Sequence, residues 1–141
     1  QLEHRIYAVE LSPERQAKAE ELGAIVVRPE EGESIVEAIH RLTGGGADVS
    51  YEVTGVPVVL GQALAAVHKA GECMVVSIWE REASINPNEF AIQEKSLKGI
   101  IAYRHIFPKV LELMEQGYFS AEKLVTKKIK LEISLKKDLL N

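Results

Sequence analysis

The sequence has little cysteine and no long apolar run. Its 141 residues contain a single cysteine, Cys73, which excludes an internal disulfide and a cysteine-rich zinc site. No apolar stretch approaches the roughly 20 residues that cross a bilayer as a helix. The first residues do not resemble a secretory signal peptide. We therefore expect a cytoplasmic protein with no membrane partner.

Positive charge is also scarce. Lysine and arginine total 17 against 21 aspartate and glutamate residues, which gives a formal net charge of −4. Proteins that bind nucleic acid normally carry a clustered basic face, so the composition predicts no nucleic-acid partner. The four histidines show no metal-ligand spacing, and a metal site within this chain is not expected.

The remaining composition is that of an ordinary globular domain, with 46% hydrophobic and 27% charged residues. Short β-prone runs alternate with helical patterns of about 10–15 residues, which favours a parallel sheet with helices on both faces. We expect one α/β domain with a doubly wound, Rossmann-type, mostly parallel sheet. The predicted strands span 5–9, 25–27, 48–53, 73–78 and 97–102, and the predicted helices span 13–22, 34–42, 58–68 and 107–116.

Ligands of such sheets bind beyond the carboxyl ends of the strands, so the residues after each strand are the candidate site. Glu10 ends the first strand, where an acidic side chain accepts hydrogen bonds from the ribose hydroxyls of an adenine dinucleotide. It would also repel the additional phosphate of NADP, which favours NAD. By position alone, a solvated carboxylate is an equally good interpretation. Arg15, early in the next helix, is either a neighbour of the adenosine or a surface charge.

The later strand ends offer two further groups of candidates. Thr54, Gly55 and Val56 follow a strand and open a helix, where glycine permits close backbone approach and the helix start has free N–H groups. A tight turn between strand and helix explains the same residues. Ser77 and Ile78 end a buried strand and either present backbone groups to a flat ring or simply terminate the strand.

The sequence contains no G-x-G-x-x-G motif. Gly44–Gly46 follows a helix and precedes a strand, the reverse of the order in phosphate loops, and is predicted to be a helix-terminating turn. The acidic residue of a dinucleotide fold falls about 20 residues after the glycine motif, so we expect that loop and its strand upstream of Gln1. Without this central strand, the strands at 5–9 and 49–53 should close against each other, or the chain should self-associate.

Three stretches of the sequence resemble a known family. The runs YAVELSPER (7–15) with AEELGA (19–24), and TGGGADVSYEVTG (43–55), resemble zinc-dependent medium-chain alcohol dehydrogenases. The run KGIIAYR (98–104) with the following helix resembles the butanediol dehydrogenase branch. The resemblance implies a partial NAD-binding domain over residues 1–132. Residues 133–141 depart from the family pattern and form a divergent tail.

The resemblance also implies site residues. Glu10 would bind the adenosine ribose and Arg15 would lie beside the adenosine. Further coenzyme contacts would come from Thr54, Gly55, Val56, Ser77, Ile78, Ala102 and Tyr103. The zinc ligands and the proton relay of the family lie in a separate domain outside this sequence, so the chain alone should bind NAD weakly and turn over no alcohol.

The parent protein would oxidise a secondary alcohol or a vicinal diol, such as 2,3-butanediol, with NAD. Pairing of strand 97–102 across a two-fold axis would make it a homo-oligomer.

Two other interpretations stay open from the sequence. A methyltransferase core also places an acidic residue after its second strand, and it would bind S-adenosylmethionine. A non-enzymatic α/β interaction domain would use Trp79 and Tyr103 as exposed anchors and would bind neither ligand. Titration with each ligand while thermal stability is followed separates these possibilities.

Overall fold

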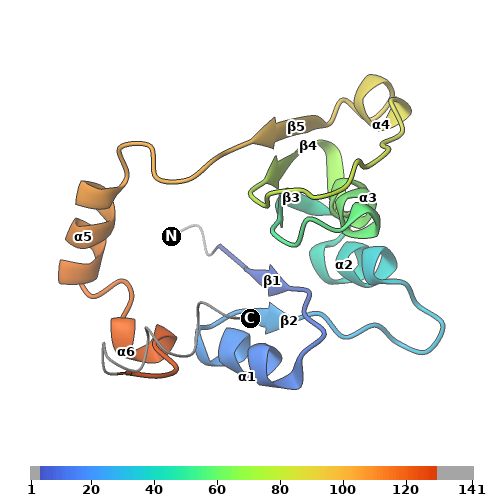
Figure 1. Ribbon diagram of the computed structural model, residues 1–141. Helices are drawn as coiled ribbons and strands as arrows, with labels where there is room; N and C mark the ends of the chain where they lie inside the picture. The colour runs from blue at the N-terminus through green and yellow to red at the C-terminus, as the bar shows by residue number, and fades with distance from the viewer. Residues whose placement is uncertain (1–3, 130–141) are drawn as a thin grey trace. The chain divides into compact units, whose positions relative to one another are not determined.

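A computed structural model describes residues 4–129 of the chain. It divides into two compact units, Gln1–Ile101 and Ala102–Asn141. The first unit alternates strands and helices (Figure 1). Its elements are β1 (Tyr7–Ala8), α1 (Pro13–Glu21), β2 (Ile25–Val26), α2 (Ile35–Thr43), β3 (Ala47–Glu52), α3 (Pro57–Ala66), β4 (Val67–Val75), α4 (Asn88–Ala91) and β5 (Ser96–Gly99).

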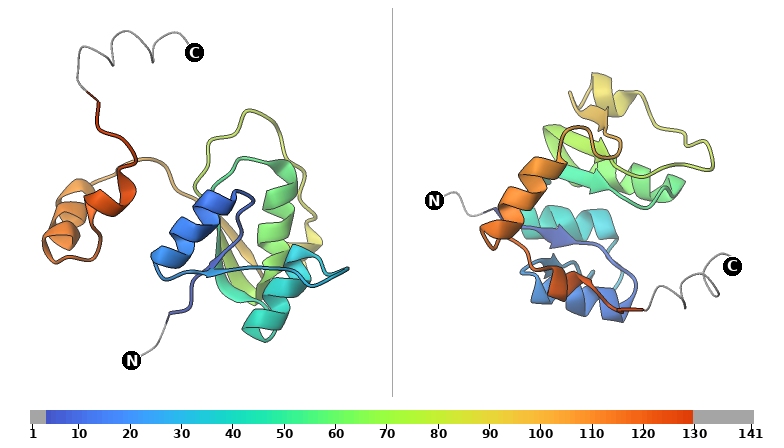
Figure 2. Two further views of the ribbon diagram at one scale, coloured as in Figure 1. Left: turned by 90° about the horizontal axis from the view of Figure 1, so that it is seen from below. Right: turned by 60° about the vertical axis from the view of Figure 1, so that its left-hand side comes forward.

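All strand pairs of the first unit are parallel. β1 pairs with β2 in one sheet, and β3, β4 and β5 follow one another in a second sheet. Helix α3 packs against β3 and β4, and α2 packs against α3 (Figure 2). The α/β class with a parallel sheet, which the sequence predicted, is confirmed.

The strands at 5–9 and 49–53 do not close against each other, because β1 and β3 belong to different sheets. The first of the two expected alternatives was therefore wrong, and self-association of the chain stays a prediction. A buried cluster instead connects the β1–β2 pair with α2 and α3. Its members are Val27, Ala38, Ile39 and Ala66, with Tyr7, Ile35 and Leu42 packed around them. The β1–β2 pair is therefore attached to the rest of the unit by apolar packing on helices, and not by hydrogen bonds between β1 and β3.

The helix starts and stops follow the local signals in the sequence. Helix α2 begins with a capping box. The Ser34 hydroxyl accepts the Glu37 N–H at 3.2 Å, and the Glu37 carboxylate accepts the Ser34 N–H at 2.8 Å. The helix ends at Gly44, whose φ of 77° is left-handed. This left-handed C-cap confirms the predicted helix-terminating turn. Two residues further on, a Cβ on Gly46 would lie 2.5 Å from the His68 backbone nitrogen.

The boundary between α3 and β4 differs from the prediction. The helix ends at Ala66, and β4 begins at Val67, where a helix to His68 and a strand from Cys73 were expected. Val67 is only 1% exposed and pairs with Ala47, after which the register shifts until Val49 faces Glu72. Val67 is thus buried as a strand residue and not as the last turn of the helix.

The second unit contains α5 (Phe107–Glu115) and α6 (Ala121–Leu124). Helix α5 agrees with the predicted helix at 107–116, and its apolar residues Leu111 and Met114 are 58% and 38% exposed. The predicted domain end at residue 132 and the divergent tail lie outside the described residues. Among residues 4–129, no helix has the length and apolar character that crossing a membrane requires.

Candidate functional site at the strand ends

Donors surround the Glu10 carboxylate, which lies just after β1. Its Oε1 atom accepts the backbone N–H groups of Leu11 at 2.7 Å and Ser12 at 2.8 Å. The Arg15 guanidinium reaches both oxygens, with Nη2–Oε1 at 2.9 Å and Nε–Oε2 at 2.7 Å. The guanidinium of Arg15 and then the Ser12 N–H lower the pKa of Glu10 to about 2. The carboxylate is therefore ionised at any ordinary pH.

The donors around Glu10 leave room for a further hydroxyl. A carboxylate oxygen accepts about two hydrogen bonds, and from the described residues Oε2 accepts one, from Arg15 Nε. The Arg15 side chain is 71% exposed, so its ion pair with Glu10 competes with water and is readily rearranged. An ionised acceptor at the end of a parallel strand, next to a movable cation, fits the ribose of an adenine nucleotide.

A second group of predicted residues gathers around Glu52, the last residue of β3. Its side chain is completely buried. The Oε1 atom accepts the N–H and hydroxyl of Thr54 at 2.8 and 2.6 Å and the Gly55 N–H at 3.0 Å. The Ser77 hydroxyl, from the end of β4, donates to Oε2. Burial acts to raise the pKa of Glu52, but the bonds from Ser77 and Thr54 outweigh it, so the pKa is below its usual value.

The turn at Gly55 lies directly against the segment that follows β4. Gly55 has a φ of 71°, and a Cβ there would lie 2.9 Å from the carbonyl oxygen of Ile78. The Val56 N–H donates to the Thr54 hydroxyl at 3.2 Å. Close approach at Gly55 was expected from the sequence, and here the partner in that approach is the chain's own backbone.

The structure thus brings the predicted site residues together in two groups within the first unit. Glu10 and Arg15 form one, at the end of β1, and the other contains Thr54, Gly55, Val56, Ser77 and Ile78, at the ends of β3 and β4. Ala102 and Tyr103 belong to the second unit, where the Tyr103 ring centre lies 5.3 Å from that of Phe107.

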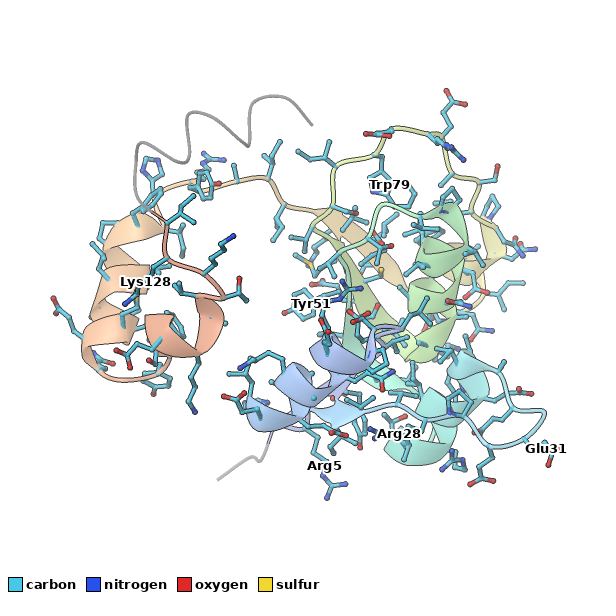
Figure 3. The ribbon with its side chains drawn as sticks, turned by 60° about the horizontal axis from the view of Figure 1, so that its bottom comes forward. Arg5, Arg28, Glu31, Tyr51, Trp79 and Lys128 are labelled. Atoms are coloured by element: carbon cyan, nitrogen blue, oxygen red, sulfur yellow. The ribbon has the colours of Figure 1, made fainter. Side chains whose placement is uncertain are left out.

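Sequence reasoning missed Glu52, which connects the turn after β3 to the end of β4. A glutamate directly before a Thr-Gly turn is the signal that could have pointed to it. Its neighbour Tyr51 is 64% exposed, and Figure 3 labels Tyr51 on β3 together with Trp79. Trp79 packs against the buried cluster of Leu60, Leu64 and Cys73, so it is not a free anchor of the kind that an interaction domain would need.

Within residues 4–129, no three histidine, cysteine, aspartate or glutamate side chains lie together as metal ligands would. Cys73, the one thiol, is fully buried in β4, and burial raises its pKa. The described residues therefore form no cluster that would fit a zinc ion.

Comparison with known proteins gives consistent results. The family model described as zinc-binding dehydrogenase matches residues 1–116. The chain is 63% identical over 127 residues to (R,R)-butanediol dehydrogenase of Bacillus subtilis (strain 168), covering 90% of this chain and 37% of that protein. It is 34% identical over 131 residues to (R,R)-butanediol dehydrogenase of Neisseria gonorrhoeae (strain ATCC 700825 / FA 1090), covering 91% of this chain and 37% of that protein.

Among solved structures, the chain is similar to the X-ray crystal structure of 2R,3R-butanediol dehydrogenase from Bacillus subtilis. The TM-score is 0.87 at 61% sequence identity, over 93% of this chain and 38% of that chain. The chain spans 37% of the length of both curated relatives.

Proposed function

The chain belongs to the zinc-binding dehydrogenase family, and from that membership we propose that it is part of the coenzyme-binding domain of an NAD-linked alcohol dehydrogenase. Its two relatives described above are named (R,R)-butanediol dehydrogenase, which supports a secondary alcohol or a vicinal diol, such as 2,3-butanediol, as the substrate of the whole protein. The domain would extend to residue 132, and residues 133–141 would diverge from the family.

The observation that carries the proposal is the ionised carboxylate of Glu10 at the end of β1. Its Oε2 atom would accept a hydroxyl of the adenosine ribose, while Arg15 turns aside to lie next to the adenosine. Because the pKa of Glu10 is about 2, the carboxylate would be charged whenever coenzyme binds. A phosphate on the ribose would meet this negative charge, which supports NAD over NADP.

The residues after β3 and β4 would receive the nicotinamide half of the coenzyme. Support comes from the close approach of the Gly55 turn to the Ile78 carbonyl oxygen, which brings the segments after the two strands next to each other. Backbone groups of Ala102 and Tyr103 would meet the carboxamide. NAD supplies the hydride acceptor for alcohol oxidation, and the residues of this chain would bind and orient it.

The zinc ion that the family name implies would be held by residues outside the described part of this chain, since none of the described residues forms a ligand cluster. In the whole protein it would act as a Lewis acid on the alcohol oxygen. The contribution of this chain would be the position and orientation of the coenzyme.

Calorimetric titration of the whole protein with NAD, NADP and AMP tests the proposal. We expect NAD and AMP to bind more tightly than NADP. The Glu10→Gln variant should bind NAD and AMP roughly tenfold more weakly, because a charged acceptor is lost, and should discriminate less against NADP. Glu14→Gln, an equal change of charge on an exposed residue of α1, is the control and should leave all three affinities unchanged.

Thermal unfolding of the whole protein with NAD or S-adenosylmethionine added has two outcomes that would contradict the proposal. Thermal stabilisation by S-adenosylmethionine and not by NAD would favour a methyltransferase core. Stabilisation by neither ligand would favour a non-enzymatic interaction domain.

We also infer that the whole protein is a homo-oligomer. In the described residues, β5 is the last strand of its sheet, and a strand edge of this kind pairs readily with a second copy. Light scattering coupled to size-exclusion chromatography should give a mass that is a multiple of the chain mass. A monomer over the whole concentration range would contradict the inference.

A further inference from the structure

We propose that Glu52 is a positioning residue, whose buried carboxylate holds the turn after β3 and the end of β4 in the arrangement that receives the nicotinamide half of the coenzyme. This role rests on the proposed function, which assigns the two segments to the coenzyme. Glu52 itself is fully buried, so it would act through the residues that donate to it and not by touching the ligand.

The hydrogen bonds of Glu52 divide between the two segments. On one side, Oε1 accepts the Thr54 N–H at 2.8 Å, the Thr54 hydroxyl at 2.6 Å and the Gly55 N–H at 3.0 Å. From the second segment, the Ser77 hydroxyl donates to Oε2, which also accepts a longer bond of 3.4 Å from the Gly55 N–H. A single side chain therefore fixes the direction of the backbone after β3 and the position of the side chain at the end of β4.

The chemistry of the site requires a carboxylate. An apolar residue at position 52 would fill the same space, but the N–H groups of Thr54 and Gly55 would lose their acceptor. A buried charge is costly unless it is fully hydrogen-bonded. Within residues 4–129, the donors to Glu52 come from the two segments and not from a basic side chain. The arrangement of these donors therefore stabilises the buried charge. Displacing either segment would leave the carboxylate buried with fewer hydrogen bonds, which is unfavourable.

The Gly55 turn adds a steric constraint to the same arrangement. Its α-carbon lies so close to Ile78 that a Cβ would approach the Ile78 carbonyl oxygen to 2.9 Å. The carboxylate and this close contact act at adjacent points, so the two segments have little freedom to move apart while Glu52 is charged and bonded.

The test compares NAD with AMP in the whole protein, because AMP lacks the nicotinamide half. In the Glu52→Gln variant we expect NAD to bind roughly tenfold more weakly, since a neutral amide replaces the charged acceptor and directs an NH₂ group at one of the donors. The affinity for AMP, which the Glu10 end would hold, should stay within about twofold of the wild-type value. The KM for NAD should rise in parallel.

Ser50→Ala is the matched control. Ser50 lies on the same strand and donates to the Ala63 carbonyl at 2.8 Å, so its loss weakens β3 against α3 without touching either turn. It should lower thermal stability and leave the ratio of NAD affinity to AMP affinity unchanged. A purely structural role for Glu52 predicts the same unchanged ratio for Glu52→Gln, and that result would overturn the proposal.

Glu52→Asp provides a second variant if Glu52→Gln does not fold. It keeps the charge but is shorter by one methylene, so it cannot reach both segments, and the ratio should again fall. An unchanged ratio in this variant would also overturn the proposal. If the wild-type protein binds neither NAD nor AMP, the proposed function itself fails. That result differs from a Glu52 variant that binds both ligands with an unchanged ratio of NAD affinity to AMP affinity.

Discussion

At the scale of single residues, the charge state of the candidate site depends on an ion pair at the protein surface. The Arg15 guanidinium is the largest of the causes that lower the pKa of Glu10. A carboxyl with a lowered pKa stabilises the folded protein above the ordinary value of 4.5, and that contribution disappears as the pH falls from 4.5 to about 2.

We predict that Arg15→Gln raises the pKa of Glu10 from about 2 toward 4.5, so that Glu10 stabilises the folded protein less at neutral pH. The loss of this smaller contribution still begins near pH 4.5 but is complete at a higher pH than in the wild type. Carboxyl carbon shifts of Glu10, followed by NMR over a pH titration, measure this directly. Lys18→Gln, on the same helix, is the control. A pKa that stays near 2 in the Arg15 variant would show that the backbone donors of Leu11 and Ser12 suffice.

We predict that Gly55→Ala destabilises the protein by about 2 kcal/mol, because an L-residue is strained at a left-handed φ and its Cβ would collide with the Ile78 carbonyl oxygen. NAD affinity should fall as well. Gly61→Ala is the control: Gly61 lies inside α3 with nothing within 4 Å of a Cβ, and alanine there should stabilise the protein by about 0.5–1 kcal/mol. Urea unfolding curves measure both changes, and equal effects at both glycines would contradict the steric explanation.

The candidate residues at the strand ends were predictable from the sequence, because their position depends only on where a strand stops. Thr54 and Gly55 stand directly before a helix start, and Ser77 stands at the end of an apolar run. Glu52 was not predictable in the same way, since a glutamate in an alternating strand is expected on the exposed face. Its burial becomes intelligible only when the donors from two separate segments are seen together.

At the scale of helices and strands, capping determines where the helices begin. The capping box of α2 satisfies donors at both Ser34 and Glu37, and the helix then buries Ala38 and Ile39 against α3. Loss of the capping hydrogen bonds of α2 would therefore also weaken the apolar packing that holds the β1–β2 pair.

We predict that Ser34→Ala lowers the free energy of unfolding by about 1 kcal/mol, the usual value for a lost N-cap. The same substitution at Ser12, whose hydroxyl lies 3.5 Å from the backbone nitrogen of Arg15, should lower the free energy of unfolding by less. Thermal unfolding of both variants, compared with the wild type, tests whether the loss of stability is larger at Ser34 than at Ser12. A larger loss at Ser12 would show that helix α1 depends on its cap more than the geometry indicates.

The end of α3 was harder to predict than its start. Leu60, Ala63, Leu64 and Val67 follow one another at helical spacing, so periodicity alone extends the helix through Val67. In the structure Val67 is the first residue of β4, paired with Ala47. A buried valine is compatible with the last turn of α3 and with the first residue of β4, and only the long-range pairing with β3 decides between the two.

At the scale of the whole molecule, the parallel α/β class followed from the alternation of elements, whereas the division into two sheets did not. Strand pairing depends on contacts between residues far apart in the sequence, which local patterns do not specify. The division of the chain after Ile101 likewise has no clear mark in the composition.

We predict that removal of zinc from the whole protein by a chelator abolishes alcohol oxidation and leaves the Kd for NAD near its original value. The reason is that the described residues contain no ligand cluster, while the nucleotide contacts proposed for this chain need no metal. Calorimetric titration before and after chelation measures the Kd, and readdition of zinc should restore turnover. A large fall in NAD affinity on chelation would contradict this separation of tasks.

Cys73 lies in β4, between β3 and β5, with no exposed surface. A thiol in that place can be alkylated only after the strand separates from a neighbour, so the speed of labelling under native conditions would report how often the sheet opens. A nucleotide that rests on the ends of β3 and β4 would slow this labelling, and the protection factor would give its affinity without any measurement of turnover.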